Sequence, residues 1–141
     1  MGDVNAKVQK DIDQPAAKIW AVVSDFANVG WAMPGVKVTS EGSGVGMVRT
    51  MHIPNSDPVA EVLETLDPAN YSFSYTIAKM PMPMTGFRGW AKLEKLSESK
   101  TRVHWGAEGQ TTEGGDAAAL SAMFEGMYGQ LVASLEQEVS K

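Results

Sequence analysis

The sequence of 141 residues contains no cysteine and only two histidines. Without cysteine the chain can form neither a disulfide framework nor a thiolate zinc site, and this composition fits a reducing compartment. No His-Glu-x-x-His motif, clustered carboxylate spacing or Gly-x-Ser-x-Gly motif occurs. We therefore expect no metal, no cofactor and no serine-hydrolase chemistry.

The chain also lacks a run of basic residues. It has 12 Lys and Arg against 17 Asp and Glu, which gives a formal net charge of -5. Binding to nucleic acid needs a basic stripe, because the phosphate backbone supplies most of the affinity. We therefore expect no nucleic-acid partner.

Long apolar runs are absent as well. The first nine residues alternate polar and apolar side chains, without the apolar run of a secretory signal. The composition of 43% hydrophobic and 21% charged residues is that of an ordinary globular protein. We expect one domain covering residues 1–141, a cytoplasmic location, no membrane span, and a monomer or weak homodimer.

Alternating and helical patterns divide the chain into elements. Alternation predicts a first strand over Val4–Ile12, and a broad apolar stripe predicts a helix over about Pro15–Asp25. A second, short helical turn is expected in the apolar stretch Phe26–Pro34, which Pro34-Gly35 ends. Six more alternating segments, separated by turn residues, are predicted to be strands: Val36–Thr39, Met47–Ile53, Val59–Leu66, Tyr71–Ala78, Phe87–Leu96 and Thr101–Thr111.

A long amphipathic helix is predicted at the C-terminal end. Asp116 is a suitable N-cap, and apolar residues then recur every three or four positions, at Leu120, Phe124, Met127, Leu131 and Leu135. Short connections between strands favour antiparallel neighbours, and the helices are segregated from the strands. The predicted fold class is α+β, with a seven-stranded antiparallel sheet, two short helices between its first two strands, and the long C-terminal helix.

Two charged residues are predicted to face the core. Arg49 shares strand parity with Met47 and Met51, and Glu61 shares it with Leu63. If their strands form a hairpin, the two side chains can meet as an inward ion pair. The pair could anchor a ligand through Arg49 and move a proton through Glu61; it could also only tie two strands together, or a β-bulge could turn one residue outward.

Other motifs are less specific. Gly44 to Arg49 begins like a dinucleotide fingerprint but opens a strand, so its glycines are assigned to a tight turn. His52 and His104 lie on the parity opposite the core and are predicted to be surface residues. The run Met80-Pro81-Met82-Pro83-Met84 could form a lip over a cavity, a dimer contact, or simple cover for the core.

With these residues in view, the chain resembles the SRPBCC superfamily, which includes START-like lipid carriers, the birch-pollen allergen group and the polyketide cyclase/dehydrase group. The resemblance covers nearly the whole chain. It rests on Asp11-Ile12-Asp13 followed by Pro15 to Trp20, on Asp25-Phe26 with Trp31 and Pro34, on Gly44 to Arg49, and on Glu61 to Glu64 leading to Asp67-Pro68. It implies the helix-grip fold, in which a curved sheet wraps around the C-terminal helix. A cavity for small hydrophobic molecules is expected between the sheet and this helix.

One branch, similar to the plant lachrymatory-factor synthases, uses an arginine and a glutamate in successive strands for proton transfer. Arg49 and Glu61 match those positions, which implies an anchor and a possible acid or base. We expect a small hydrophobic ligand, including lipid, to bind in the cavity. The residues expected to line it are Trp31, Met47, Arg49, Met51, Glu61, Leu63, Phe73, Tyr75, Phe87, Trp105, Phe124, Met127 and Tyr128.

Two other functions remain open at this point. A cyclase, dehydratase or isomerase would use Arg49 to stabilise negative charge and Glu61 to shuttle a proton. An interaction protein would instead use the methionine-proline run to dimerise or to meet a partner. Fold alone does not choose among these functions.

Overall fold

A computed structural model describes residues 2–141. The elements follow in the order β1 (Asp3–Ile12), α1 (Ala16–Val23), β2 (Lys37–Glu41), β3 (Val48–His52), β4 (Val59–Asp67), the 3-10 turn η1 (Pro68–Asn70), β5 (Ser72–Thr76), β6 (Met84–Ser97), β7 (Lys100–Thr111) and α2 (Ala117–Val139). The seven strands form one antiparallel sheet in the order β1-β7-β6-β5-β4-β3-β2. The predicted α+β class and helix-grip arrangement are confirmed.

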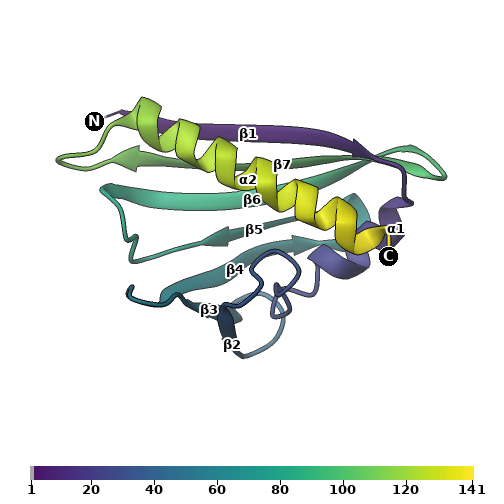
Figure 1. Cartoon of the computed structure of the whole chain (residues 1–141), viewed down its shortest axis with the longest axis horizontal. Helices are drawn as coiled ribbons and strands as arrows, with labels where there is room; N and C mark the ends of the chain where they lie inside the picture. The colour runs from purple at the N-terminus through teal and green to yellow at the C-terminus, as the bar shows by residue number, and fades with distance from the viewer. Residues whose placement is uncertain (1) are drawn as a thin grey trace.

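Helix α2 lies across one face of the sheet. In Figure 1 it runs diagonally from the start of β1 toward α1, and it packs mainly against β1 and β7. One rung of the sheet places Leu63, Tyr75, Gly89, Ala107 and Ala6 side by side on β4, β5, β6, β7 and β1. Ala107 and Ala6 lie in β7 and β1, the strands that α2 contacts most, so the helix can approach the sheet there.

The N-terminus of α2 is capped as the sequence predicts. The Asp116 carboxylate accepts a hydrogen bond of 3.1 Å from the amide of Ala119. The buried stripe of α2 consists of Phe124, Tyr128, Val132, Leu135 and Val139. This stripe differs from the predicted one, which contained Met127.

Met127 is 52% exposed, so its predicted place in the lining is wrong. Consecutive residues of a helix are separated by about 100° around its axis. Because Tyr128 points toward the narrow face that β1 and β7 cover, the side chain of Met127 points away from that face. The amphipathic Tyr128 is buried in its place.

The predicted second helix between β1 and β2 is also wrong. The described residues contain a single helix there, and the segment after it forms turns. The carbonyl of Val29 accepts hydrogen bonds from the amides of Ala32 and Met33, which form one isolated turn. Propagation stops because Pro34 disfavours the helical region for the residue before it, and Gly35 takes a φ of +82°.

Candidate functional site

Arg49 and Glu61 face each other across neighbouring strands. Arg49 of β3 is paired in register with Glu61 of β4, without a bulge between those strands. Arg49 Nε donates to Glu61 Oε1 at 2.6 Å, and the two side chains are only 8% and 12% exposed. The predicted inward ion pair therefore forms, and the alternative of a bulge that turns one residue outward is wrong.

The loop after α1 completes the surroundings of Arg49. Nη1 of Arg49 donates a hydrogen bond of 3.0 Å to the carbonyl oxygen of Phe26. The guanidinium carbon lies 3.8 Å from the centre of the Phe26 ring and 5.3 Å from that of Tyr75, which is cation-π geometry. Sequence reasoning missed the role of Phe26, because its apolar side chain gave no sign that its carbonyl would hold a charge.

The ion pair leaves one polar atom free on each partner. Within residues 2–141, no hydrogen bond reaches Nη2 of Arg49 or Oε2 of Glu61. Among residues 2–141, the fully buried side-chain nitrogen or oxygen atom without a hydrogen-bond partner is Trp31 Nε1. Arg49 Nη2 and Glu61 Oε2 are not in this fully buried class, so both atoms keep access to solvent.

A second pair on the other face of the sheet gives a comparison. Arg88 binds Glu64 with two parallel hydrogen bonds, of 2.6 and 2.7 Å, and its remaining nitrogen faces Glu108 at 3.5 Å. This two-point geometry is the usual one for arginine and a carboxylate. It also holds the pKa of Glu64 below its ordinary value, chiefly through the hydrogen bonds from Arg88 and then Ser74. The Arg49–Glu61 pair departs from this geometry and keeps a free donor beside a free acceptor.

A buried chain of polar side chains links the sheet to α2 beside this pair. Trp105 Nε1 of β7 donates to the Tyr75 hydroxyl of β5 at 3.3 Å, and that hydroxyl lies 3.2 Å from the hydroxyl of Tyr128 on α2. Burial, followed by the negative charge of Glu61, raises the pKa of Tyr75 to about 12. Burial, followed by the electrostatic interaction with the neighbouring Tyr75 hydroxyl, raises the pKa of Tyr128 well above its ordinary value. Both phenols therefore stay protonated at neutral pH.

Gly89 makes room for this chain. Gly89 is the cross-strand partner of Tyr75, and a Cβ at this position would overlap the Tyr75 ring and lie 2.6 Å from its hydroxyl oxygen. The absence of a side chain therefore lets the phenol lean across β6 toward Trp105 and Tyr128.

Most of the predicted lining residues come together on the α2 side of the sheet. The aromatic rings form a continuous cluster with centroid separations of 5.5 to 6.4 Å. Buried members of the predicted set are Arg49, Met51, Leu63, Phe73, Tyr75, Phe87, Trp105, Phe124 and Tyr128, whereas Trp31, Met47 and Glu61 are partly buried. Met127 is outside the cluster, as described above.

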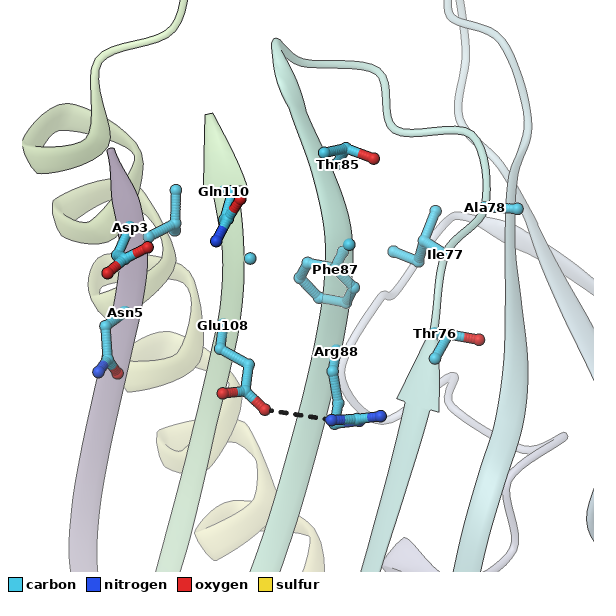
Figure 2. Close-up of a pocket in the computed structure, with 13 residues that line it drawn as sticks. Asp3, Asn5, Thr76, Ile77, Ala78, Thr85, Phe87, Arg88, Glu108 and Gln110 are labelled. Carbon is cyan, nitrogen blue, oxygen red and sulfur yellow. Dashed lines mark hydrogen bonds and ion pairs between the residues drawn. The ribbon is translucent and has the colours of Figure 1, made fainter. Parts of the chain in front are cut away.

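A wide hollow lies elsewhere, on the face of the sheet that points away from α2. Its volume is about 870 Å³, and it forms where β6 bulges between Thr85 and Arg88. Figure 2 shows Asp3, Asn5 and Glu108 around it, with Arg88 joined to Glu108. Neither Arg49 nor Glu61 lines it, and Arg88 is already engaged by carboxylates. We therefore place the candidate site at Arg49 and Glu61.

The methionine-proline segment leads into β6. Met84 begins that strand and is buried, while Met80 and Met82 are partly buried and pack against the core. Cover for the core, one of three roles predicted for this segment, is therefore observed.

The two histidines make polar contacts at the surface. His52 Nε2 lies 2.9 Å from the Thr39 hydroxyl, and His104 Nε2 lies 3.0 Å from the Glu94 carboxylate. The partners in these contacts, Thr39 and Glu94, are not part of the aromatic cluster, so neither histidine belongs to the candidate site.

No helix within residues 2–141 has the length and apolar character needed to cross a membrane. A search of curated protein sequences gives no match. A family model described as "Polyketide cyclase / dehydrase and lipid transport" matches residues 3–140.

Solved structures show the same fold at low sequence identity. An uncharacterised protein from Bacillus thuringiensis superposes with a TM-score of 0.82 at 17% identity, covering 98% of this chain and 100% of that one. Norcoclaurine synthase from Thalictrum flavum, in complex with dopamine and hydroxybenzaldehyde, gives 0.77 at 14% identity over 98% and 87% of the two chains. The Zhui aromatase/cyclase from Streptomyces sp. R1128 gives 0.77 at 16% identity over 99% and 94%.

Proposed function

Because the chain belongs to the polyketide cyclase / dehydrase and lipid transport family, we propose that it binds a small hydrophobic molecule between its sheet and α2, with the polar end of that molecule at Arg49 and Glu61. The apolar part of the ligand would contact the aromatic cluster that extends from Phe26 to Phe124.

The observation that carries this proposal is the unsaturated ion pair. Removing two charges from water costs on the order of several kcal/mol per ion. Their mutual attraction offsets this cost only when the remaining donors and acceptors also form hydrogen bonds. Arg49 Nη2 and Glu61 Oε2 have no hydrogen-bond partner within residues 2–141 and keep access to solvent, and the rings of Phe26 and Tyr75 lie beside the guanidinium. A ligand oxygen at Nη2, or a ligand hydroxyl at Oε2, would complete the pair.

A pair that only tied β3 to β4 together would gain more from two parallel hydrogen bonds, as Arg88 and Glu64 make on the other face. Two structural neighbours support an aromatic or cyclic ligand, since one is a complex with dopamine and hydroxybenzaldehyde and the other is an aromatase/cyclase. At 14% and 16% identity those proteins share the fold, so their ligands serve here only as a guide to probes.

A second candidate function is catalysis by proton transfer. It is favoured by the free Oε2 of Glu61, a carboxylate oxygen next to a cation in a mostly apolar site. In this function Arg49 stabilises negative charge that develops on a substrate oxygen while Glu61 accepts and returns the proton. On a substrate that the protein turns over, Glu61→Gln should abolish turnover and leave binding largely intact. Unchanged turnover would exclude this role for Glu61.

Binding is tested by a thermal-shift screen of naphthalenes and biphenyls that carry one ketone or carboxylate. The informative variant is the double substitution Arg49→Leu and Glu61→Leu, because it removes the pair without leaving one charge buried alone. The matched control is Arg88→Leu with Glu64→Leu on the other face.

The proposal predicts that wild type and control are stabilised by the same compounds and that the Arg49/Glu61 variant is not, since a ligand stabilises only the form that binds it. Equal stabilisation of all three proteins would place binding elsewhere. No stabilisation of wild type by any compound in the screen would count against a hydrophobic ligand of this size.

A further inference from the structure

The buried chain of Trp105, Tyr75 and Tyr128 has one more donor hydrogen than it can use. The indole N–H and the two phenol hydroxyls supply three hydrogens, whereas the only acceptors within the chain are the two hydroxyl oxygens. Two hydrogen bonds join the three groups, so one hydroxyl hydrogen has no acceptor. No other hydrogen bond from residues 2–141 reaches either hydroxyl.

The free hydrogen lies on Tyr128 when Tyr75 is the donor of their hydrogen bond, and on Tyr75 when Tyr128 is the donor, because either hydroxyl can donate. Trp105 donates to Tyr75, because an indole nitrogen can only donate. When Tyr75 then donates to Tyr128, each hydroxyl oxygen accepts one hydrogen bond and the bonds polarise one another in sequence. The end of this sequence is the hydroxyl of Tyr128, on the face of α2 that is turned toward the sheet.

The surroundings of this hydroxyl are apolar on one side and charged on the other. Phe124 stacks on the Tyr128 ring at 6.0 Å, and Phe124 in turn contacts Phe87 at 5.5 Å. On the opposite side, Tyr75 separates Tyr128 from the guanidinium of Arg49. An acceptor supplied to the free hydrogen would therefore lie next to the aromatic cluster that the proposed ligand of the Arg49–Glu61 pair contacts.

We propose that the ligand carries a neutral carbonyl oxygen that accepts the unpaired hydroxyl hydrogen of the Tyr75–Tyr128 pair. This inference rests on the proposed function, because it assigns a chemical group to the ligand of that same site. A neutral oxygen suits this position better than a carboxylate, since Glu61 already places a negative charge nearby. A buried hydroxyl that gains an acceptor also loses the penalty of an unmade hydrogen bond.

Three probes of the same shape separate the carbonyl from the rest of the ligand. Acetylnaphthalene has the ketone, ethylnaphthalene replaces it with a hydrocarbon, and naphthoate replaces it with an anion. The affinity of each is measured by fluorescence titration, and the ketone stretching band of bound acetylnaphthalene is recorded by isotope-edited infrared spectroscopy.

The variant that removes both hydroxyls is Tyr75→Phe with Tyr128→Phe. Both must change, because Tyr75 alone would present its own free hydrogen 3.2 Å away once the Tyr128 hydroxyl is gone. The matched control is Tyr71→Phe, which removes the hydroxyl of the remaining tyrosine outside the chain of hydrogen bonds. Tyr71 is partly buried and packs its ring against Trp20.

For wild type and Tyr71→Phe, the proposal predicts tighter binding of acetylnaphthalene than of the other two probes, and a ketone band shifted to lower wavenumber than in hexane. In the double variant, the preference for the ketone over the hydrocarbon should fall by at least about 5-fold, the factor expected when a buried acceptor loses its donor. The shift of the ketone band should disappear as well.

Other outcomes contradict different parts of the account. Equal binding of acetylnaphthalene and ethylnaphthalene to wild type, with the band at its hexane position, would overturn the carbonyl assignment and leave the hydrophobic site standing. It would mean that water satisfies the hydroxyl. Binding of none of the three probes would contradict the proposed function and the assignment together. If the double variant fails to fold, an unshifted band in wild type still overturns the assignment, and a shifted band supports the tyrosines only if Arg49→Leu with Glu61→Leu keeps that shift.

Discussion

Arg49 and Glu61 depend on each other for their place in the core. Arg49→Leu leaves the largely buried carboxylate of Glu61 without its partner, so we expect the free energy of unfolding to fall by about 3–5 kcal/mol. Arg49→Leu with Glu61→Leu removes both charges and should leave the protein as stable as wild type or more stable. Urea denaturation of the three proteins measures this difference.

The same substitution at Arg88 is the control, because Arg88 is half exposed and an exposed ion pair contributes only about 0–1 kcal/mol. A double Arg49/Glu61 variant that is no more stable than the single variant would show that the pair holds the fold together, and this would remove the main support for a ligand role.

The two tyrosines of the buried chain should differ in their effect on stability. Tyr75→Phe leaves the indole N–H of Trp105 without an acceptor in the core, which costs about 1–3 kcal/mol. Tyr128→Phe keeps the bond between Trp105 and Tyr75, and one hydroxyl hydrogen lacks an acceptor both before and after the substitution. Thermal unfolding in the absence of ligand should therefore give a clearly lower Tm for Tyr75→Phe. The reverse order would mean that Tyr128 accepts or donates a bond that the proposed chain lacks.

For individual residues, strand parity predicted that the side chains of Arg49 and Glu61 meet. Both residues lie on the core-facing parity of two short strands joined by a turn, so pairing of these strands brings the two side chains within reach. The bond between Trp105 and Tyr75 could not be predicted in the same way. It joins β7 to β5 across the intervening β6, and it depends on the missing side chain of Gly89.

Helix α2 contains two glycines on its exposed face. Gly126 and Gly129 lie in the middle of the helix, and a Cβ added at either position meets nothing within 4 Å. Gly126→Ala with Gly129→Ala should therefore stabilise the protein by roughly 0.5–1 kcal/mol for each residue, because alanine loses less backbone entropy in a helix. Urea denaturation provides the measurement.

Gly89→Ala is the opposite case, since its Cβ would overlap the Tyr75 ring. It should lower stability and disturb the near-ultraviolet circular dichroism of the aromatic cluster. If the two helix substitutions also lowered stability, α2 would have to contact something on its exposed face that residues 2–141 do not supply.

The elements themselves were largely predictable, because alternation and turn residues mark the strands clearly. The errors have local physical causes. Met127 was placed in the core because it is apolar, yet the face of α2 in contact with the sheet is narrow and Tyr128 occupies it. The second short helix was expected from apolar composition, but Pro34 and the positive φ of Gly35 favour turns there.

The whole molecule should lose stability in acid. Hydrogen bonds from Arg102 and Arg88, respectively, hold the pKa of Asp11 and of Glu64 below their ordinary values. A carboxyl whose pKa is lower in the folded state stabilises that state above its unfolded pKa, and this contribution is lost as the pH falls through the folded pKa.

Urea denaturation at about pH 7 and about pH 3 should therefore show lower stability in acid, and the loss should be smaller in Asp11→Asn with Glu64→Gln. Asp57→Asn is a suitable control, because Asp57 is exposed. An identical loss in the variant and in wild type would assign the acid sensitivity to other carboxyls.

The most direct test of the account is a titration of wild-type protein with acetylnaphthalene, followed by amide proton–nitrogen correlation spectra. Binding between the sheet and α2 predicts shifts that centre on Arg49, Glu61, Tyr75 and Tyr128, which lie on β3, β4, β5 and α2. Shifts confined to Asp3, Asn5 and Glu108 around the hollow on the other face, or no shifts at all, would contradict it.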